Sequence, residues 1–273
     1  MSRDLLSVLI DERNHKINTG IYNKLQVDFA YNSNHIEGSR LTHDQTRYIF
    51  ETRALVIEPA DKVIRVDDII ETDNHFKCFS HILDTIEQPL SANYIKDLHR
   101  RLKTGTASAE SMEAVVGDYK KYANYAGETK TSPPQKVDSD MNGLLSAYNA
   151  LPVCSLYNIA DFHARFEKIH PFYDGNGRVG RLLMFKECVK NGIVPFIITD
   201  EYKIFYGRNL KQWQDGKGKE ALIDTFLLMQ DNMKALLDYF EIDYDHQETT
   251  AREVLKQAIS EGKKSGQPFG ENR

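Results

Sequence analysis

Hydrophobic residues recur along this chain at the three- and four-residue spacing of amphipathic helices. The spacing predicts one or two helices over residues 3–36, with Gly38 as the stop. Thr42 and Gln45 have the form of a capping box, which predicts that the next helix begins there. The later helices are expected at about 42–54, 67–83, 91–102, 136–149, 156–168, 176–192, 200–213, 219–240 and 247–261. Most of the chain is therefore expected to be helical.

The segment 104–135 interrupts this pattern. It is rich in small and turn-forming residues, carries tyrosines at a spacing of three, and ends in Pro133-Pro134. This composition predicts a loop that holds a short hairpin over about 117–130. Because no internal repeat or low-complexity linker divides the sequence, we expect one helical domain with an N-terminal helical segment and one hairpin.

Composition and charge narrow the class of protein. The chain has 273 residues, of which 41% are hydrophobic and 10% aromatic, so it can bury a sizeable core and is not disordered. Its net charge of −5 disfavours broad nucleic-acid binding, and three cysteines without a CxxC spacing favour a reducing compartment. Charges interrupt the only apolar stretch near the N-terminus, and no run approaches the roughly 18 apolar residues of a membrane span. We therefore expect a cytoplasmic protein that binds neither nucleic acid nor membrane.

The stretch from His163 to Met184 carries the strongest chemical signal. Gly175-Asn176-Gly177 opens a predicted helix, where backbone N–H groups can converge on an anion. Arg178 and Arg181 lie three residues apart, hence on one face of that helix, and suit a polyphosphate. Just before them, a carboxylate at Asp174 could hold Mg²⁺, and His170 has the side chain expected of a general base.

Residues 170–181, with the sequence HPFYDGNGRVGR, resemble the Fic-domain signature HxFx(D/E)GNGRxxR without a mismatch. The resemblance can be extended over about 20–240, with 117–134 similar to the family's flap and its exit. It implies an all-α Fic fold, a helical bundle with a short β-hairpin flap over the active site. The expected parts are an N-terminal helical segment at 1–60, a Fic core at 61–240, and a C-terminal helix and tail at 241–273.

The resemblance also implies an activity. Fic enzymes mostly transfer AMP from ATP to a Ser, Thr or Tyr hydroxyl of a target protein, in a Mg²⁺-dependent reaction that releases pyrophosphate. By that resemblance His170 would take the proton of the hydroxyl, Asp174 would hold Mg²⁺, and the Asn176 side chain would join the backbone around the phosphates. Arg178 would contact the β-phosphate and Arg181 the γ-phosphate. The residues expected to bind ATP are Asp174, Gly175, Asn176, Gly177, Arg178, Gly180, Arg181 and Tyr206.

Two of these expectations concern less specific positions. Tyr206 falls where relatives place an aromatic residue at the adenine, or it is a core tyrosine on a helix. The flap would offer an extended edge to the target protein. The main chain of the flap would pair with the main chain of the target, and such pairing does not depend on the target's sequence. The residues expected at that edge are Asn124, Tyr125, Ala126 and Gly127. The target could be the chain itself, and family members often self-associate, so a homo-oligomer is possible.

A second motif lies near the N-terminus. Residues 33–38, with the sequence SNHIEG, are similar to the family's inhibitory motif (S/T)xxxE(G/N). The resemblance implies that Glu37 pairs bidentately with Arg181 and so competes with the γ-phosphate of ATP, with Ser33 fixing the local network. In some relatives the same glutamate serves the removal of AMP, so a bifunctional or mainly deadenylylating enzyme is an alternative.

Other functions remain open from the residues alone. Glu167 and His170 have the ExxH spacing of di-iron bundles, but the second ExxH that such a bundle needs is missing, so His163 is expected to be a buried core residue. Relatives that transfer UMP or phosphocholine, or that phosphorylate, are further possibilities; the intact GNGR core favours AMP. A non-enzymatic nucleotide sensor would not need the general base at His170.

Overall fold

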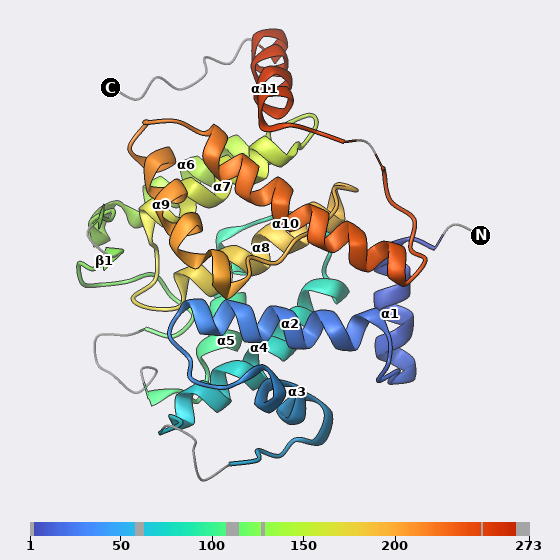
Figure 1. Cartoon of the computed structure of the whole chain (residues 1–273). Coiled ribbons are helices and arrows are strands. Elements are labelled where there is room, and N and C mark those ends of the chain that lie inside the picture. The colour runs from blue at the N-terminus through green and yellow to red at the C-terminus, as the bar shows by residue number, and fades with distance from the viewer. Residues whose placement is uncertain (1–2, 58–62, 108–114, 127–128, 247, 266–273) are drawn as a thin grey trace.

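The structure is a computed structural model that describes residues 3–57, 63–107, 115–126, 129–246 and 248–265. Helices make up nearly all of its regular structure (Figure 1). The helices are α1 (Leu5–His15), α2 (Ile21–Ile36), α3 (His43–Thr52), α4 (Val66–Asp84), α5 (Ala92–Lys103), α6 (Pro134–Asn149), α7 (Leu156–Ile169), α8 (Asn176–Lys190), α9 (Lys203–Gln214), α10 (Glu220–Tyr239) and α11 (Ala251–Ser265), and a short 3₁₀ turn, η2, covers Asp200–Tyr202.

The predicted helices are confirmed, and the first predicted range divides into α1 and α2. Lys16 ends α1 in the left-handed conformation, and Gly20 caps the start of α2. The capping box at the start of α3 is also confirmed, because Thr42 and Gln45 exchange side-chain to backbone hydrogen bonds.

The predicted hairpin region contains little strand. Strands β1 (Tyr125–Ala126) and β2 (Thr129–Lys130) pair antiparallel over two residues each. Gly127 lies outside the described residues. Polar side chains rather than a ladder hold this segment: the buried Lys120 donates to the side chains of Asn124 and Thr131.

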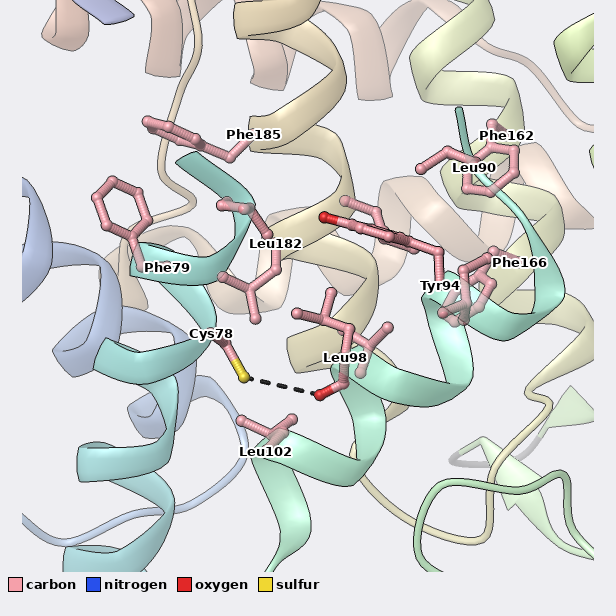
Figure 2. Packing of buried hydrophobic residues seen from close by; sticks show 14 of the residues in the cluster. Cys78, Phe79, Leu90, Tyr94, Leu98, Leu102, Phe162, Phe166, Leu182 and Phe185 are labelled. Carbon is pink, nitrogen blue, oxygen red and sulfur yellow. Dashed lines mark hydrogen bonds between the residues drawn. The ribbon is translucent and has the colours of Figure 1, made fainter. Parts of the chain in front are cut away.

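Helix α8 lies in the middle of the molecule and is buried on almost every side. Phe185 of α8 packs against Phe79 of α4, and Leu182 lies beside Leu98 and Leu102 of α5 (Figure 2). The buried positions of α8 include charged residues, among them Arg178 and Arg181, as well as apolar ones, so neighbouring helices must both cover it and supply polar partners. The surrounding helices therefore hold the N-terminal end of α8 in one place.

The same hydrophobic core runs across the boundary expected at residue 60. It joins Leu9 and Leu25 of the N-terminal helices to Phe166 of α7 and Leu237 of α10. A second cluster, which includes the fully buried Phe226 of α10, packs α7 and α9 against α10 and α11. Among the described helices, none combines the length and the apolar character that crossing a bilayer requires.

Candidate active site

The loop between α7 and α8 brings the predicted catalytic residues together. His170 ends α7 in the left-handed conformation, with φ 52°, which is uncommon for a residue with a β-carbon. Gly175, with φ 83°, is the N-cap of α8. Two reversals of the chain within six residues turn it back on itself. They place His170 and the N-terminus of α8 at the two ends of one short loop, and the unpaired N–H groups of a helix N-terminus attract anions.

The side chain of Asn176 locks this loop. Its Oδ1 accepts from the N–H of Phe172 at 2.8 Å, and its Nδ2 donates to the carbonyl of the same residue at 2.9 Å. The ring of Phe172 is fully buried and stacks on His99 at a centroid distance of 3.8 Å. Because the Asn176 amide is engaged at both ends by the loop, its backbone N–H, rather than the side chain expected from the sequence, is the group left to meet an anion.

His170 is oriented for proton transfer. Its Nδ1 lies 3.3 Å from the carbonyl oxygen of Glu167, which can only accept, so this nitrogen carries the proton. In the neutral ring Nε2 is then the acceptor. The side chain is 17% exposed, so a substrate hydroxyl can approach it.

Arg181, one turn into α8, meets the predicted inhibitory residues. Its Nη2 lies 2.7 Å from Oε1 of Glu37 and 2.9 Å from the carbonyl oxygen of Ser33, and its Nε donates to the Ser33 hydroxyl at 3.0 Å. The ion pair runs through one carboxylate oxygen, because Ser33 takes the donors that a bidentate contact would use. Burial alone would lower the pKa of Arg181, but the Glu37 carboxylate outweighs it and raises the pKa above its ordinary value.

Two glycines of α8 make room for carboxylates. A β-carbon at Gly177 would overlap the carboxylate of Glu37, so the inhibitory side chain lies directly against the first turn of the helix. A β-carbon at Gly180 would lie 2.6 Å from Oε1 of Glu167 and 2.9 Å from Cε1 of His163. Gly180, expected among the ATP-binding residues, thus faces α7 rather than the helix N-terminus.

Arg178 and Asp174 belong to a buried ionic network that the sequence did not predict. Arg178 pairs with Glu71 of α4 and lies 3.5 Å from Oδ1 of Asp174. Lys103, the last residue of α5, pairs with the same Glu71 and lies 2.5 Å from Oδ2 of Asp174. Burial would raise the pKa of Asp174, but the charges of Arg178 and Lys103 and the N–H of Gly175 lower it to about 2.

The chemistry of this carboxylate fits a magnesium ion. Asp174 is ionised at neutral pH and its side chain is 45% exposed, although two cations lie beside it. Mg²⁺ is commonly held by one or two carboxylates together with substrate phosphates. Within the described part of the chain, no group of three or more His, Cys, Asp or Glu side chains is arranged to hold a metal, so the remaining ligands would come from substrate and water.

The structure places Tyr206 in the core. Its hydroxyl lies 2.5 Å from Nε2 of His163, and its side chain is buried. This position corresponds to the core tyrosine that the sequence left as an alternative to an adenine contact. The prediction that His163 is a buried, hydrogen-bonded core residue is confirmed.

One of the predicted target-docking residues, Asn124, contacts the catalytic loop. Asn124 donates to the carbonyl oxygen of Phe172 at 2.8 Å, which ties the hairpin segment to the loop. The side chain of Tyr125 is 71% exposed. The backbone of Ala126 forms part of β1, and Gly127 is outside the described residues.

Four site residues carried only weak signals in the sequence. His99 lies on the apolar face of α5, where it donates to the carbonyl of Asp174 and accepts from the N–H of Gly117. Burial lowers the pKa of His99 to about 4, so the ring is neutral. Glu71 and Lys103 are charged residues on otherwise buried helix faces. Lys120 is likewise a buried charged residue, but it lies in the loop that precedes β1. In the sequence, a charged residue on an otherwise apolar helix face could have indicated a buried polar contact, but it does not predict which residue forms the other half of that contact.

Comparison with known proteins agrees with this geometry. Residues 89–188 match the model of the Fic/DOC family. A protein adenylyltransferase Fic from Nematostella vectensis is 29% identical over 189 residues, which cover 68% of this chain and 43% of that protein. The protein adenylyltransferase fic-1 of Caenorhabditis elegans is 25% identical over 210 residues, covering 74% of this chain and 40% of that protein. The chain thus spans about two fifths of the length of these curated relatives.

Solved structures share the fold. A Fic domain containing signaling protein from Bacteroides thetaiotaomicron aligns with a TM-score of 0.64 at 22% identity, over 98% of this chain and 99% of that chain. A fragment of Fic-1 from C. elegans aligns with a TM-score of 0.67 at 20% identity, over 86% of this chain and 72% of that chain. The part of the chain that matches the Fic/DOC family model, residues 89–188, contains the signature at residues 170–181, and the chain shares its fold with these solved Fic structures.

Proposed function

We propose that this chain is a protein adenylyltransferase that its own helix α2 holds inactive. It transfers AMP from ATP to a hydroxyl group of a target protein. The observation that carries the proposal is the joint arrangement of His170, the N-terminus of α8, and Arg181 in contact with Glu37. The names of the curated relatives support the reaction class.

The chain's own groups account for the chemistry of the transfer. Nε2 of His170 takes the proton of the attacking hydroxyl while the oxygen bonds to the α-phosphorus. The bond between the α-phosphorus and the bridging oxygen breaks, and pyrophosphate leaves. The fixed Nδ1–H bond to the Glu167 carbonyl keeps the imidazole in the tautomer that can accept this proton.

The first turn of α8 holds the phosphates. Its free N–H groups and partial positive charge stabilise negative oxygens, and they need no rearrangement as the reaction proceeds. When Glu37 no longer pairs with Arg181, the guanidinium group of Arg181 binds the γ-phosphate. A divalent cation on Asp174, when bound, neutralises charge on the transferring phosphates.

The proposed inhibition by Glu37 follows from competition between Glu37 and the γ-phosphate for Arg181. Glu37 places its carboxylate against Gly177 and Arg181, in the space the resemblance assigns to the γ-phosphate. Polar contacts of Asn34 with Thr72 and of Asn32 with the N–H of Asp200 hold helix α2 in this place. Removing the charge of Glu37 therefore leaves Arg181 without a carboxylate partner, while α2 and the Ser33 contacts stay in place.

Target docking would use the segment that carries β1. The bonds of Lys120 and Asn124 fix this segment relative to His170, so a bound peptide would present its hydroxyl at a constant distance from the base. Main-chain pairing reads no sequence, and the target's identity must come from other contacts.

The test uses labelled ATP and two variants. Glu37→Gly should raise AMP transfer to protein by about five- to 150-fold, the usual range of coupling between an inhibitory contact and a ligand. Transfer is measured as protein-bound label from [α-³²P]ATP in lysate and with the purified chain alone, and mass spectrometry then locates the AMP adduct. Adding His170→Ala to Glu37→Gly should abolish transfer while ATP binding is kept. AMP transfer that persists in the double variant would contradict the role of His170 as the base. AMP transfer that Glu37→Gly leaves unchanged would contradict the inhibitory role of Glu37.

A further inference from the structure

Lys103 lies between two carboxylates that have different surroundings. Its Nζ pairs with Oε1 of Glu71 and lies 2.5 Å from Oδ2 of Asp174. The side chains of Lys103 and Glu71 are 3% and 11% exposed, whereas that of Asp174 is 45% exposed. One partner of the lysine is therefore buried and the other is open to ligands.

The backbone of Lys103 is held firmly, so only its side chain can adjust. The amide of Asn74 donates to the carbonyls on either side, those of Leu102 and Thr104, at 3.0 and 2.8 Å. Thr106 donates to the carbonyl of Lys103 itself at 2.9 Å. The lysine side chain then runs past the N-cap of α8, where a β-carbon on Gly175 would lie 3.4 Å from its Cδ.

The charges around Lys103 balance. Glu71 and Asp174 supply two negative charges, and Lys103 and Arg178 supply two positive ones. A divalent cation that approaches Asp174 therefore meets a carboxylate already neutralised by its neighbours. The cation and Lys103 then compete for this carboxylate, because like charges that close together repel each other.

We propose that Lys103 is an internal cation that competes with a divalent metal for Asp174, and that Glu71 is the carboxylate that retains Lys103 when the metal displaces it. The proposal rests on the proposed function, in which Asp174 is a metal ligand. Glu71 can play this part because each of its oxygens already holds one cation, Lys103 on Oε1 and Arg178 on Oε2. Lys103 and Glu71 are thus positioning residues that set the metal affinity of Asp174 without touching the metal.

The two residues should change metal affinity in opposite directions. Lys103→Met removes the competitor, so metal should bind about tenfold more tightly, a change of ~1.4 kcal/mol. Glu71→Gln leaves Lys103 with Asp174 as its charged partner, so metal should bind several-fold more weakly. If Glu71 acts through Lys103, Glu71→Gln should have a smaller effect in the Lys103→Met background than in the wild type.

The experiment measures binding rather than activity. Mn²⁺ is titrated into each purified variant, and the free ion is followed by electron paramagnetic resonance. Lys234→Met, which removes a surface lysine on α10 paired with Asp231, is the matched control and should leave Mn²⁺ binding unchanged. Thermal unfolding by circular dichroism checks that each variant is folded. If Lys103→Met does not fold, Lys103→Gln keeps a hydrogen-bond donor for Glu71 and removes the charge.

The outcomes separate this proposal from the proposed function. Asp174→Asn combined with Lys103→Met should lose the tightened site; if it keeps the site, Asp174 is not the ligand and the metal assignment fails. If Asp174→Asn removes binding but Lys103→Met binds Mn²⁺ no more tightly than the wild type, the competition by Lys103 is wrong and the metal assignment stands. Tighter binding in Glu71→Gln would overturn the role given to Glu71.

Discussion

Arg178 and Arg181 lie one turn apart on α8, both are 3% exposed, and each pairs with a glutamate from an earlier helix. Their partners differ. Glu37 caps the end of α2, is 35% exposed, and pairs with one arginine. Glu71 lies inside α4, is 11% exposed, and pairs with two cations. Glu37 is therefore open to solvent on one side, whereas Glu71 is nearly enclosed. The first pair is suited to a switch and the second to a fixed support.

The strongest test of this difference is stability. Glu71→Ala leaves two buried cations with Asp174 as their remaining partner and should lower the free energy of unfolding by about 3–5 kcal/mol. Glu37→Ala removes a partly exposed partner, and Ser33 continues to hold Arg181, so the loss should be about 1 kcal/mol or less. Urea unfolding of both variants gives the comparison. Equal losses would show that the two contacts are equally permanent.

A second test uses pH, because His75 of α4 lies near both arginines. Neither of its ring nitrogens has a hydrogen-bond partner among the described residues, and burial, followed by the charges of Arg181 and Arg178, lowers its pKa to about 3. Below about pH 6.5 the unfolded chain takes up this proton and the folded chain does not, so stability falls as the pH drops towards 3. Between pH 7 and 4.5 His75 should account for ~3 kcal/mol of lost stability.

His75→Leu is the variant that isolates this contribution. It should flatten the acid side of the profile of unfolding free energy against pH by that amount. His246→Leu, on a side chain outside the core near the C-terminal end of α10, is the control and should leave the profile unchanged. A profile for His75→Leu that runs parallel to the wild type would mean that His75 is already protonated beside the arginines.

The smallest expected effect concerns the packing of α8 against α7, because this packing positions both arginines. Gly180→Ala pushes a β-carbon into Glu167 and His163 of α7 and should cost about 1–3 kcal/mol of stability, more than the ~1 kcal/mol by which alanine favours a helix. Gly143, inside α6, has open space around its missing β-carbon, so Gly143→Ala should stabilise by up to ~1 kcal/mol. Thermal melts of the two variants should shift in opposite directions; a shift of the same sign would show that α7 yields to the added methyl group.

The helices were predictable because their apolar spacing and caps are local. The capping box at Thr42 depends on residues within one turn, so it was visible in the sequence, whereas the break between α1 and α2 before Gly20 was not located. The hairpin region was predicted over 117–130, but the described strands cover four residues of it. Side-chain hydrogen bonds of Lys120 and Asn124 fix the remainder of this segment. Such bonds produce no periodic pattern in the sequence from which they could be predicted.

The candidate site divides in the same way. The loop from His170 to Arg181 was predictable, because the glycines, the asparagine and the helix start that shape it are consecutive. The sequence also identified Glu37 as the partner of Arg181, through a motif and not through spacing. No local pattern predicts that Lys103 meets Asp174 and Glu71, since 71 residues separate Lys103 from Asp174 and 32 separate it from Glu71. Periodicity tells which face of a helix is buried, but the packing of α4 and α5 on α8 decides which charges meet there.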